Sequence, residues 1–206
     1  MRKGIVLVMS GPSGAGKSTL TQRLLADVPS ATFSISCTSR QPRAGEVDGR
    51  DYYFISGDEF ERRRKAGEFA EWATVHNNLY GTPVEPLNKL LNSGKDVILD
   101  IDVQGACQFK MSMPDSSFVF VLPPSLKILR QRLLARGLDD AAIIEARLKK
   151  AREEINQAGW FDGIIVNDNL EKAYRELQSF YIAATLKPQC IQPLLSAFMH
   201  SDFTDA

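Results

Sequence analysis

Cysteine and histidine are scarce in this chain of 206 residues, which has three of the former and two of the latter. Cys37, Cys107 and Cys190 are odd in number and far apart, so they indicate neither a disulfide framework nor a metal site. Such sparse, unpaired cysteine is typical of the reducing cytosol. The histidines, His76 and His200, have no partner at a spacing useful for catalysis.

Neither charge sign is in excess, because 25 basic residues balance 25 acidic ones. No global field therefore favours nucleic acid or an anionic membrane, and anion binding must come from local clustering. No run approaches the ~18 apolar residues that indicate a membrane span. The basic, apolar start over residues 2–9 is too short for a signal peptide. We expect a cytoplasmic protein with no nucleic-acid or membrane partner; the sequence does not name a protein partner.

The most informative segment is Gly11-Pro12-Ser13-Gly14-Ala15-Gly16-Lys17-Ser18-Thr19, which directly follows an apolar run over residues 5–9. It matches the phosphate-loop pattern G-x-x-x-x-G-K-[ST] between a strand and a helix. The glycines let backbone N–H groups surround a phosphate, and the helix directs its positive end at the same anion. Lys17 supplies charge to the outer phosphates, and the Ser18 hydroxyl can join Mg²⁺ together with those phosphates and water. We predict a nucleoside-triphosphate site; a glycine-rich turn without chemical meaning is the alternative.

Continuous apolar runs alternate with segments of helical period. Four runs indicate strands buried on both faces, over residues 4–9, 97–99, 118–122 and 164–166. The helical segments cover residues 18–26, 103–110, 125–135, 139–158 and 170–186. This alternation predicts an α/β fold with a parallel sheet flanked by helices, and ligands at the carboxyl ends of the strands.

Two segments interrupt the alternation. Residues 34–85 are rich in Arg, Gly, Tyr and Thr, with strand-like pieces at 52–55 and 68–75 around a helical piece at 58–66. We predict an inserted mixed α/β subdomain that closes over a second ligand, and a small helical lid over about 125–148. The whole chain is then one domain, with its core in residues 1–33, 86–124 and 149–187. We expect the tail, 188–206, to be partly frayed.

The first insertion carries side chains suited to a nucleotide: Ser36, Arg40, Arg43, Tyr52, Glu71, Tyr80 and Thr82. Two arginines and two phenols can hold one phosphate by forked and single hydrogen bonds. A carboxylate can accept both the ring N–H and the amine of guanine, whereas adenine presents an acceptor there and is rejected. Taken alone, the arginines could be solvated loop charges, and Glu71 could pair with an arginine.

Together these motifs resemble the guanylate kinases of the P-loop nucleoside monophosphate kinase family, from Ile5 to about Leu186. The segments that carry the resemblance are GPSGAGKST (11–19), SISCTSRQPRAGEVDGRDYYF (34–54), EFAEWATVHNNLYGT (68–82), ILDIDVQG (98–105), LPPS (122–125), RLLARG (132–137) and IIVNDN (164–169). The resemblance implies a P-loop NTPase fold and Mg²⁺-dependent transfer of the ATP γ-phosphate to GMP and dGMP, in purine metabolism and GMP recycling.

The resemblance also implies a role for each matching residue. Guanine would contact Ser36, Glu71 and Thr82, and the GMP phosphate would contact Arg40, Arg43, Tyr52 and Tyr80. Asp100 and Asp102 match an acidic pair near GMP and the metal-bound phosphates. Lid arginines Arg132, Arg136 and Arg147 would close over ATP, and Asn167 would lie near adenine. Lys17, Arg40 and the three lid arginines would be catalytic. The residues alone leave open that Asp102 caps a helix, which can coexist with a role in binding, and that the lid arginines form a solvated face.

Some positions depart from the usual family pattern: Cys37, Ser39, Pro83 and Val103. None of them removes a proposed contact. Two other functions stay open: a non-catalytic module that binds phosphorylated protein segments at the GMP site, and a kinase for another small phosphate acceptor. The intact Gly16-Lys17-Ser18 argues against the first, and Glu71 with Ser36 and Thr82 against the second.

Overall fold

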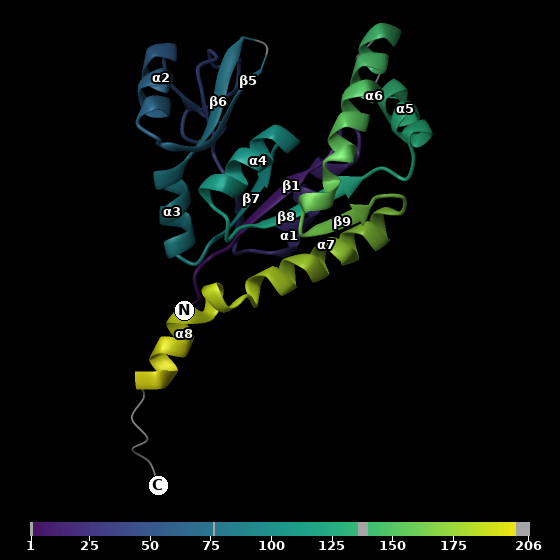
Figure 1. The fold of residues 1–206 in the computed structure, drawn as a ribbon. Coiled ribbons are helices and arrows are strands. Elements are labelled where there is room, and N and C mark those ends of the chain that lie inside the picture. The colour runs from purple at the N-terminus through teal and green to yellow at the C-terminus, as the bar shows by residue number, and fades with distance from the viewer. Residues whose placement is uncertain (1, 76, 136–139, 201–206) are drawn as a thin grey trace.

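The structure, a computed structural model, describes residues 2–75, 77–135 and 140–200. A central sheet carries helices on both faces, two lobes rise from one side of it, and the last helix projects from the opposite side (Figure 1). The α/β fold with a parallel core sheet is as predicted.

Five parallel strands form the central sheet in the order β2-β7-β1-β8-β9. Their bounds are β1 Val6–Ser10, β2 Ala31–Phe33, β7 Asp96–Asp100, β8 Ser117–Leu122 and β9 Gly163–Val166. Val8 in the middle strand lies between Leu99 and Phe118. The four predicted strands are confirmed within a few residues. β2 was not predicted, because three partly exposed residues at a sheet edge carry no readable pattern.

The helices around this sheet are α1 Lys17–Asp27, α3 Val84–Asn92, α4 Val103–Ser112 and α7 Leu170–Thr185. Successive side chains of a strand point to opposite faces, so β1 contributes to two cores. Leu7 and Met9 pack with α1 and α7 on one face, while Val6 and Val8 pack with α3 and α4 on the other. This double burial explains why the strand sequences are apolar throughout.

A second, four-stranded sheet lies within the predicted insertion, in the order β4-β3-β6-β5. Its elements are β3 Cys37–Thr38, β4 Tyr53–Phe54, α2 Gly57–Lys65, β5 Phe69–Val75 and β6 Asn78–Pro83. β3 and β4 are parallel, and the other two pairings are antiparallel. The Phe60 and Phe69 rings stack 4.4 Å apart beside buried Cys37. Burial raises the pKa of the Cys37 thiol to about 11, which makes it a neutral packing residue.

The second lobe consists of α5 Leu126–Ala135 and α6 Ala141–Asn156, followed by the 3₁₀ turn Ala158–Trp160. A small core joins the two helices: Leu129, Leu133, Ile144, Leu148 and Ala151. The Asp140 carboxylate caps α6 by accepting a 2.9 Å hydrogen bond from the Ile143 N–H. The predicted helical segments are therefore present, while Arg136 lies outside the described residues.

The expectation of a frayed tail is wrong for residues 188–200, which form α8, Pro188–His200. Pro188 begins this helix, because proline is tolerated in the first turn, where its missing N–H has no helical partner. The Cys190 carbonyl accepts a 3.0 Å hydrogen bond from the Lys3 N–H, which ties the start of α8 to the N-terminal segment.

Across the described ranges, none of the helices is both long and apolar enough for a bilayer crossing.

Candidate functional site

The predicted phosphate loop joins β1 to α1, and its conformation requires glycine. Gly11, Gly14 and Gly16 have φ angles of 137°, 92° and 99°, a region that other residues rarely adopt. A Cβ at Gly11 would lie 2.3 Å from the Val121 carbonyl oxygen. α1 begins at Lys17, so its unpaired N–H groups and positive dipole end lie at the loop. The geometry suits an anionic ligand.

Lys17 and Ser18 contact the same carboxylate at the end of β7. The Lys17 ammonium donates a 2.7 Å hydrogen bond to the Gly11 carbonyl and lies 3.6 Å from Asp100 Oδ1. The Ser18 hydroxyl is 3.5 Å from Asp100 Oδ2. Enclosure by the cleft raises the pKa of Asp100, and the Lys17 ammonium opposes that rise.

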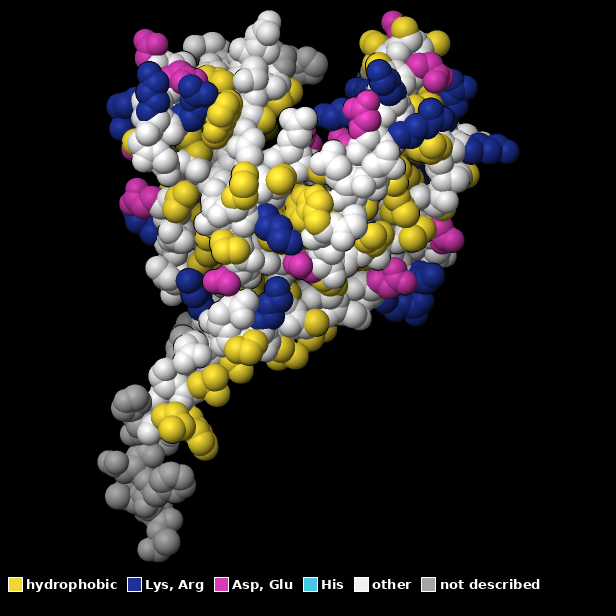
Figure 2. All heavy atoms as spheres, in the orientation of Figure 1, with side chains coloured by type: hydrophobic (Ala, Val, Ile, Leu, Met, Phe, Trp, Pro, Cys, Tyr) yellow, Lys and Arg dark blue, Asp and Glu magenta, His cyan; other side chains and the backbone are white. Residues whose placement is uncertain are grey.

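A cavity of about 290 Å³ lies between the loop, the end of β7 and α6. Figure 2 shows the molecule hollowed between its two lobes, with basic side chains on the lobe of α5 and α6. The cavity is lined by Gly11, Ser13, Gly14, Gly16, Lys17, Ser18, Thr19, Asp100, Ile101, Asp102, Arg147, Lys150 and Glu154. The structure thus brings the predicted loop, the acidic pair and one lid arginine to one cavity.

The oxygens of Ser18 and Asp100 in this cavity fit Mg²⁺. This ion prefers hard oxygen ligands and commonly takes one or two from the protein and the rest from substrate phosphates and water. Within the described part of the chain, no cluster of three or more His, Cys, Asp or Glu residues could hold a metal by itself. A Mg²⁺ ion held by Ser18 and Asp100 would take its remaining ligands from substrate phosphates and water.

Asp102 is a helix cap and also lines the cavity. Its Oδ1 accepts a 2.9 Å hydrogen bond from the Gly105 N–H at the start of α4. Its Oδ2 accepts from the Lys150 ammonium at 3.4 Å. The capping alternative for Asp102 is therefore confirmed, and it leaves the second oxygen at the cavity.

Glu71 is a buried carboxylate, only 7% exposed, on β5. Its Oε1 accepts a 2.6 Å hydrogen bond from the Thr82 hydroxyl. Burial raises the pKa of Glu71 and the Asp102 charge raises it further, while the Thr82 hydrogen bonds lower it. Among the described residues Glu71 forms no ion pair with an arginine. The alternative that Glu71 serves only to pair with an arginine is therefore not supported.

Two hydrogen bonds fix the Glu71 segment of β5 on α4. The Ser112 hydroxyl donates to the Ala70 carbonyl at 2.7 Å, and the Trp72 N–H donates to Gln108 Oε1 at 3.2 Å. Gly105 in α4 leaves space for the carboxylate, because a Cβ there would lie 3.1 Å from Glu71 Oε2. The predicted base-contacting carboxylate is therefore held by the core as well as by its own sheet.

The predicted phosphate ligands Arg40, Tyr52 and Tyr80 lie together. Arg40 Nε donates to the Tyr80 hydroxyl at 3.3 Å, and its guanidinium lies 5.5 Å from the centre of the Tyr52 ring. The two tyrosine rings meet edge to face, 5.9 Å apart. Ser36 directly precedes β3 and is half-buried. Arg40 is thus not a solvated loop charge.

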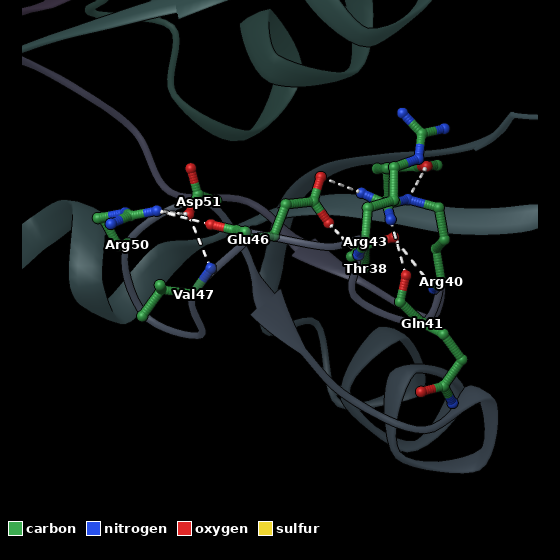
Figure 3. Close-up of polar contacts among 10 residues, drawn as sticks. Thr38, Arg40, Gln41, Arg43, Glu46, Val47, Arg50 and Asp51 are labelled. Atoms are coloured by element: carbon green, nitrogen blue, oxygen red, sulfur yellow. Dashed lines mark hydrogen bonds and ion pairs between the residues drawn. The ribbon is translucent and has the colours of Figure 1, made fainter.

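Sequence reasoning missed Glu46, which links the two arginines predicted to bind phosphate (Figure 3). Its Oε1 accepts from Arg40 at 2.9 Å, and its Oε2 accepts from the Arg43 backbone N–H at 2.7 Å. The Arg40 guanidinium and these hydrogen bonds lower the pKa of Glu46. The only sequence signal was an acid three residues beyond Arg43 in a turn. The Arg43 residue itself is exposed.

On its other side the loop contacts the second lobe and β9. Arg132 donates to the carbonyls of Ala15 at 3.3 Å and Asn167 at 2.8 Å. The Asn167 amide donates to the same Ala15 carbonyl at 2.8 Å. Both line a second cavity of about 400 Å³, together with Gly14, Gly16, Thr19, Ala135, Asp168 and Leu170. Arg132 is therefore not on a purely solvated face, and Asn167 lies beside space that a nucleoside could occupy.

The chain is similar to guanylate kinases in both sequence and fold. The family model described as guanylate kinase matches residues 3–184. The chain is 54% identical over 198 residues to a guanylate kinase of Oleidesulfovibrio alaskensis and 52% identical over 198 residues to one of Nitratidesulfovibrio vulgaris, with 96% of each chain covered in both cases. The crystal structure of guanylate kinase from Anaplasma phagocytophilum superposes with a TM-score of 0.71 at 32% identity, and 97% of each chain is covered.

Proposed function

The chain belongs to the guanylate kinase family, and on that premise we propose that it transfers the γ-phosphate of Mg²⁺-bound ATP to GMP and to dGMP. The products are ADP and GDP, or dGDP. One observation carries the proposal: a continuous series of neighbouring residues connects the phosphate loop with the buried carboxylate of Glu71. Lys17 lies 3.6 Å from Asp100, which shares one cavity with Asp102. A Cβ built on Gly105 would contact both Asp102 and Glu71.

Glu71 distinguishes guanine from adenine in this proposal. An ionised carboxylate accepts hydrogen bonds from the ring N–H and the amine of guanine, whereas adenine has an acceptor at the matching position. Because Glu71 is 7% exposed, an unmatched acceptor facing it would be costly. Ser36 and Thr82 complete the base site.

Arg40 binds the phosphate of GMP through the guanidinium N–H groups that are not already hydrogen-bonded to other residues of the protein. A guanidinium has five N–H donors. Three of its hydrogen bonds go to Tyr80, Glu46 and the Gln41 carbonyl. The remaining donors can take two phosphate oxygens, with Arg43, Tyr52 and Tyr80 supplying further contacts.

Transfer needs no general base, because a phosphate monoester oxygen is already anionic near neutral pH. Catalysis then consists of positioning and charge neutralisation in a loose transition state. Lys17 and the lid arginines Arg132, Arg136 and Arg147 supply positive charge from the protein. Ser18 and Asp100, together with the phosphates, would hold Mg²⁺, which would supply further positive charge against the transferring phosphates.

Closure of the two insertions, residues 34–85 and about 125–148, over the core excludes water. Exclusion strengthens the electrostatic contacts and suppresses hydrolysis of ATP. Such a reaction belongs to purine nucleotide metabolism and GMP recycling in the cytoplasm.

The test is ADP formation from ATP and Mg²⁺ with GMP, dGMP, AMP, CMP and UMP each offered as acceptor. We expect turnover with GMP and dGMP alone. Equal turnover with AMP would refute the role of Glu71, and ADP formation without an acceptor would indicate a hydrolase. GMP binding without turnover would indicate a binding module instead.

A further inference from the structure

Lys150 shares a cavity with the phosphate loop, although the family resemblance assigned it no role. It lies on α6, one turn after Arg147, and lines the same cavity as Lys17 and Arg147. Its Nζ lies 3.4 Å from Asp102 Oδ2 and 3.7 Å from Glu154 Oε1. Thus the aspartate that ends β7 and the one that caps α4 each have their own lysine: Lys17 at Asp100 and Lys150 at Asp102.

The balance of charge around this cavity makes Lys150 important for an anionic ligand. The lining side chains include three cations and three carboxylates: Lys17, Arg147 and Lys150, and Asp100, Asp102 and Glu154. Glu154 is only 8% exposed, and burial raises its pKa while Lys150 and Lys17 oppose the rise. Without Lys150, Asp102 would face incoming phosphates without its ion-paired ammonium, and Glu154 would keep only the weaker influence of Lys17.

A purely structural role does not account for Lys150. The α6 helix is held by a core that includes Leu148 and Ala151, and Asp102 caps α4 through the oxygen that Lys150 does not contact. The Lys150 side chain is 59% exposed, and exposed ion pairs contribute little to stability. Its ammonium has three N–H donors, so a third remains when two face Asp102 and Glu154.

We propose that Lys150 is a further phosphate-binding residue, which uses its free N–H to contact the phosphoryl group in transit. That group is the γ-phosphate of ATP before transfer and the β-phosphate of GDP after it, so this inference rests on the proposed function. Lys150 neutralises Asp102 and Glu154 and exchanges part of that contact for the phosphate when nucleotide binds.

The experiment compares Lys150→Met, which keeps the length of the stem without its charge, with Lys150→Arg, which keeps the charge. Lys149→Met is the matched control, because Lys149 is the exposed neighbour and does not line the cavity. Each protein is titrated calorimetrically, with Mg²⁺ present, with ADP and with an ATP analogue that has an imido bridge between its β- and γ-phosphates. Turnover with GMP is measured in parallel.

For Lys150→Met we expect about tenfold weaker binding of the analogue, less than about twofold change for ADP, and at least about tenfold lower kcat. Lys150→Arg should recover most of the loss, and Lys149→Met should match the wild type. Unchanged analogue binding in Lys150→Met, or equal weakening of ADP, would overturn the inference. If the wild type binds the analogue but does not phosphorylate GMP when ATP is supplied, the proposed function fails. The titrations then still decide the role of Lys150.

Discussion

Glu71 and Thr82 face each other across the β5–β6 pairing, and the Thr82 hydroxyl donates a 2.6 Å hydrogen bond to Glu71 Oε1. A β-bulge between Phe69 and Glu71 shifts the register just before this pair. Bulges re-aim side chains and are frequent beside functional sites. Because Thr82 is fully buried, this hydrogen bond fixes the orientation of the carboxylate before any base arrives.

Glu71→Gln should separate base recognition from nucleotide binding in general. The amide keeps the shape of the side chain but replaces one acceptor by a donor, which then faces a donor of guanine. We expect GMP to bind at least about a hundredfold more weakly, with ATP affinity within about twofold of the wild type. Equilibrium titrations with GMP and with ATP measure the change in affinity for each nucleotide. Equal loss for GMP and ATP would refute base recognition by Glu71.

The raised pKa of Glu71 predicts a pH dependence of stability that the glutamine variant lacks. Since burial raises the pKa of this group in the folded state, the folded protein holds the Glu71 proton more tightly than the unfolded chain. The free energy of unfolding should therefore fall as pH rises from the ordinary glutamate range through the raised folded pKa. Chemical denaturation of the wild type and of Glu71→Gln across this pH range gives the difference between their free energies of unfolding. A difference that is constant with pH would contradict the shift.

Four strands of the central sheet and the phosphate loop were predictable because their sequence signals are local. Residues buried on both faces of a parallel sheet must be apolar, and the left-handed φ angles of Gly11, Gly14 and Gly16 demand glycine. The two-residue strand β3 and the edge strand β2 were missed, since they are too short to show a period.

The partners of functional side chains were less predictable, because they depend on contacts between distant segments. Glu46 is tied to Arg40, and Lys150 to Asp102, by hydrogen bonds that no spacing rule encodes. The family resemblance named the arginines but not the acid that holds them. Likewise α8 was missed, because the tail from residue 188 was expected to be partly frayed, whereas Pro188 begins a helix.

Lys17→Ala should abolish most turnover while leaving GMP binding largely intact. Lys17 contacts the Gly11 carbonyl and Asp100, so its charge is available where we propose that the outer phosphates of ATP bind. Loss of one such electrostatic contact in a transition state typically lowers kcat by about 10²–10³-fold. Steady-state kinetics together with GMP titration test this expectation. Retention of wild-type turnover would exclude Lys17 from the reaction.

Glu46→Gln should weaken the binding of GMP but not of guanosine, which lacks the phosphate. The amide removes the charge-assisted contact with Arg40 and one of the two acceptors that hold Arg40 and the Arg43 N–H. We expect about a tenfold loss of GMP affinity. Glu61→Gln on α2, where Glu61 pairs with Arg64, is the control for loss of an acid elsewhere in the lobe. Parallel loss of guanosine binding would instead indicate general disruption of the lobe.

Gly105→Ala should reduce GMP affinity without lowering stability by a comparable amount. Alanine is favoured over glycine in a helix by about 1 kcal/mol, which offsets part of the crowding that a methyl group would cause in α4. The added Cβ would lie 3.1 Å from Glu71 Oε2, so the carboxylate must shift from the position in which we propose that it recognises guanine. We therefore expect the KM for GMP to rise about tenfold or more while the KM for ATP and the unfolding midpoint change little. Thermal unfolding and kinetics on the same preparation measure both. An unchanged KM for GMP would show that the close approach of α4 does not set the position of Glu71, whereas a large fall in the unfolding midpoint would assign Gly105 to packing.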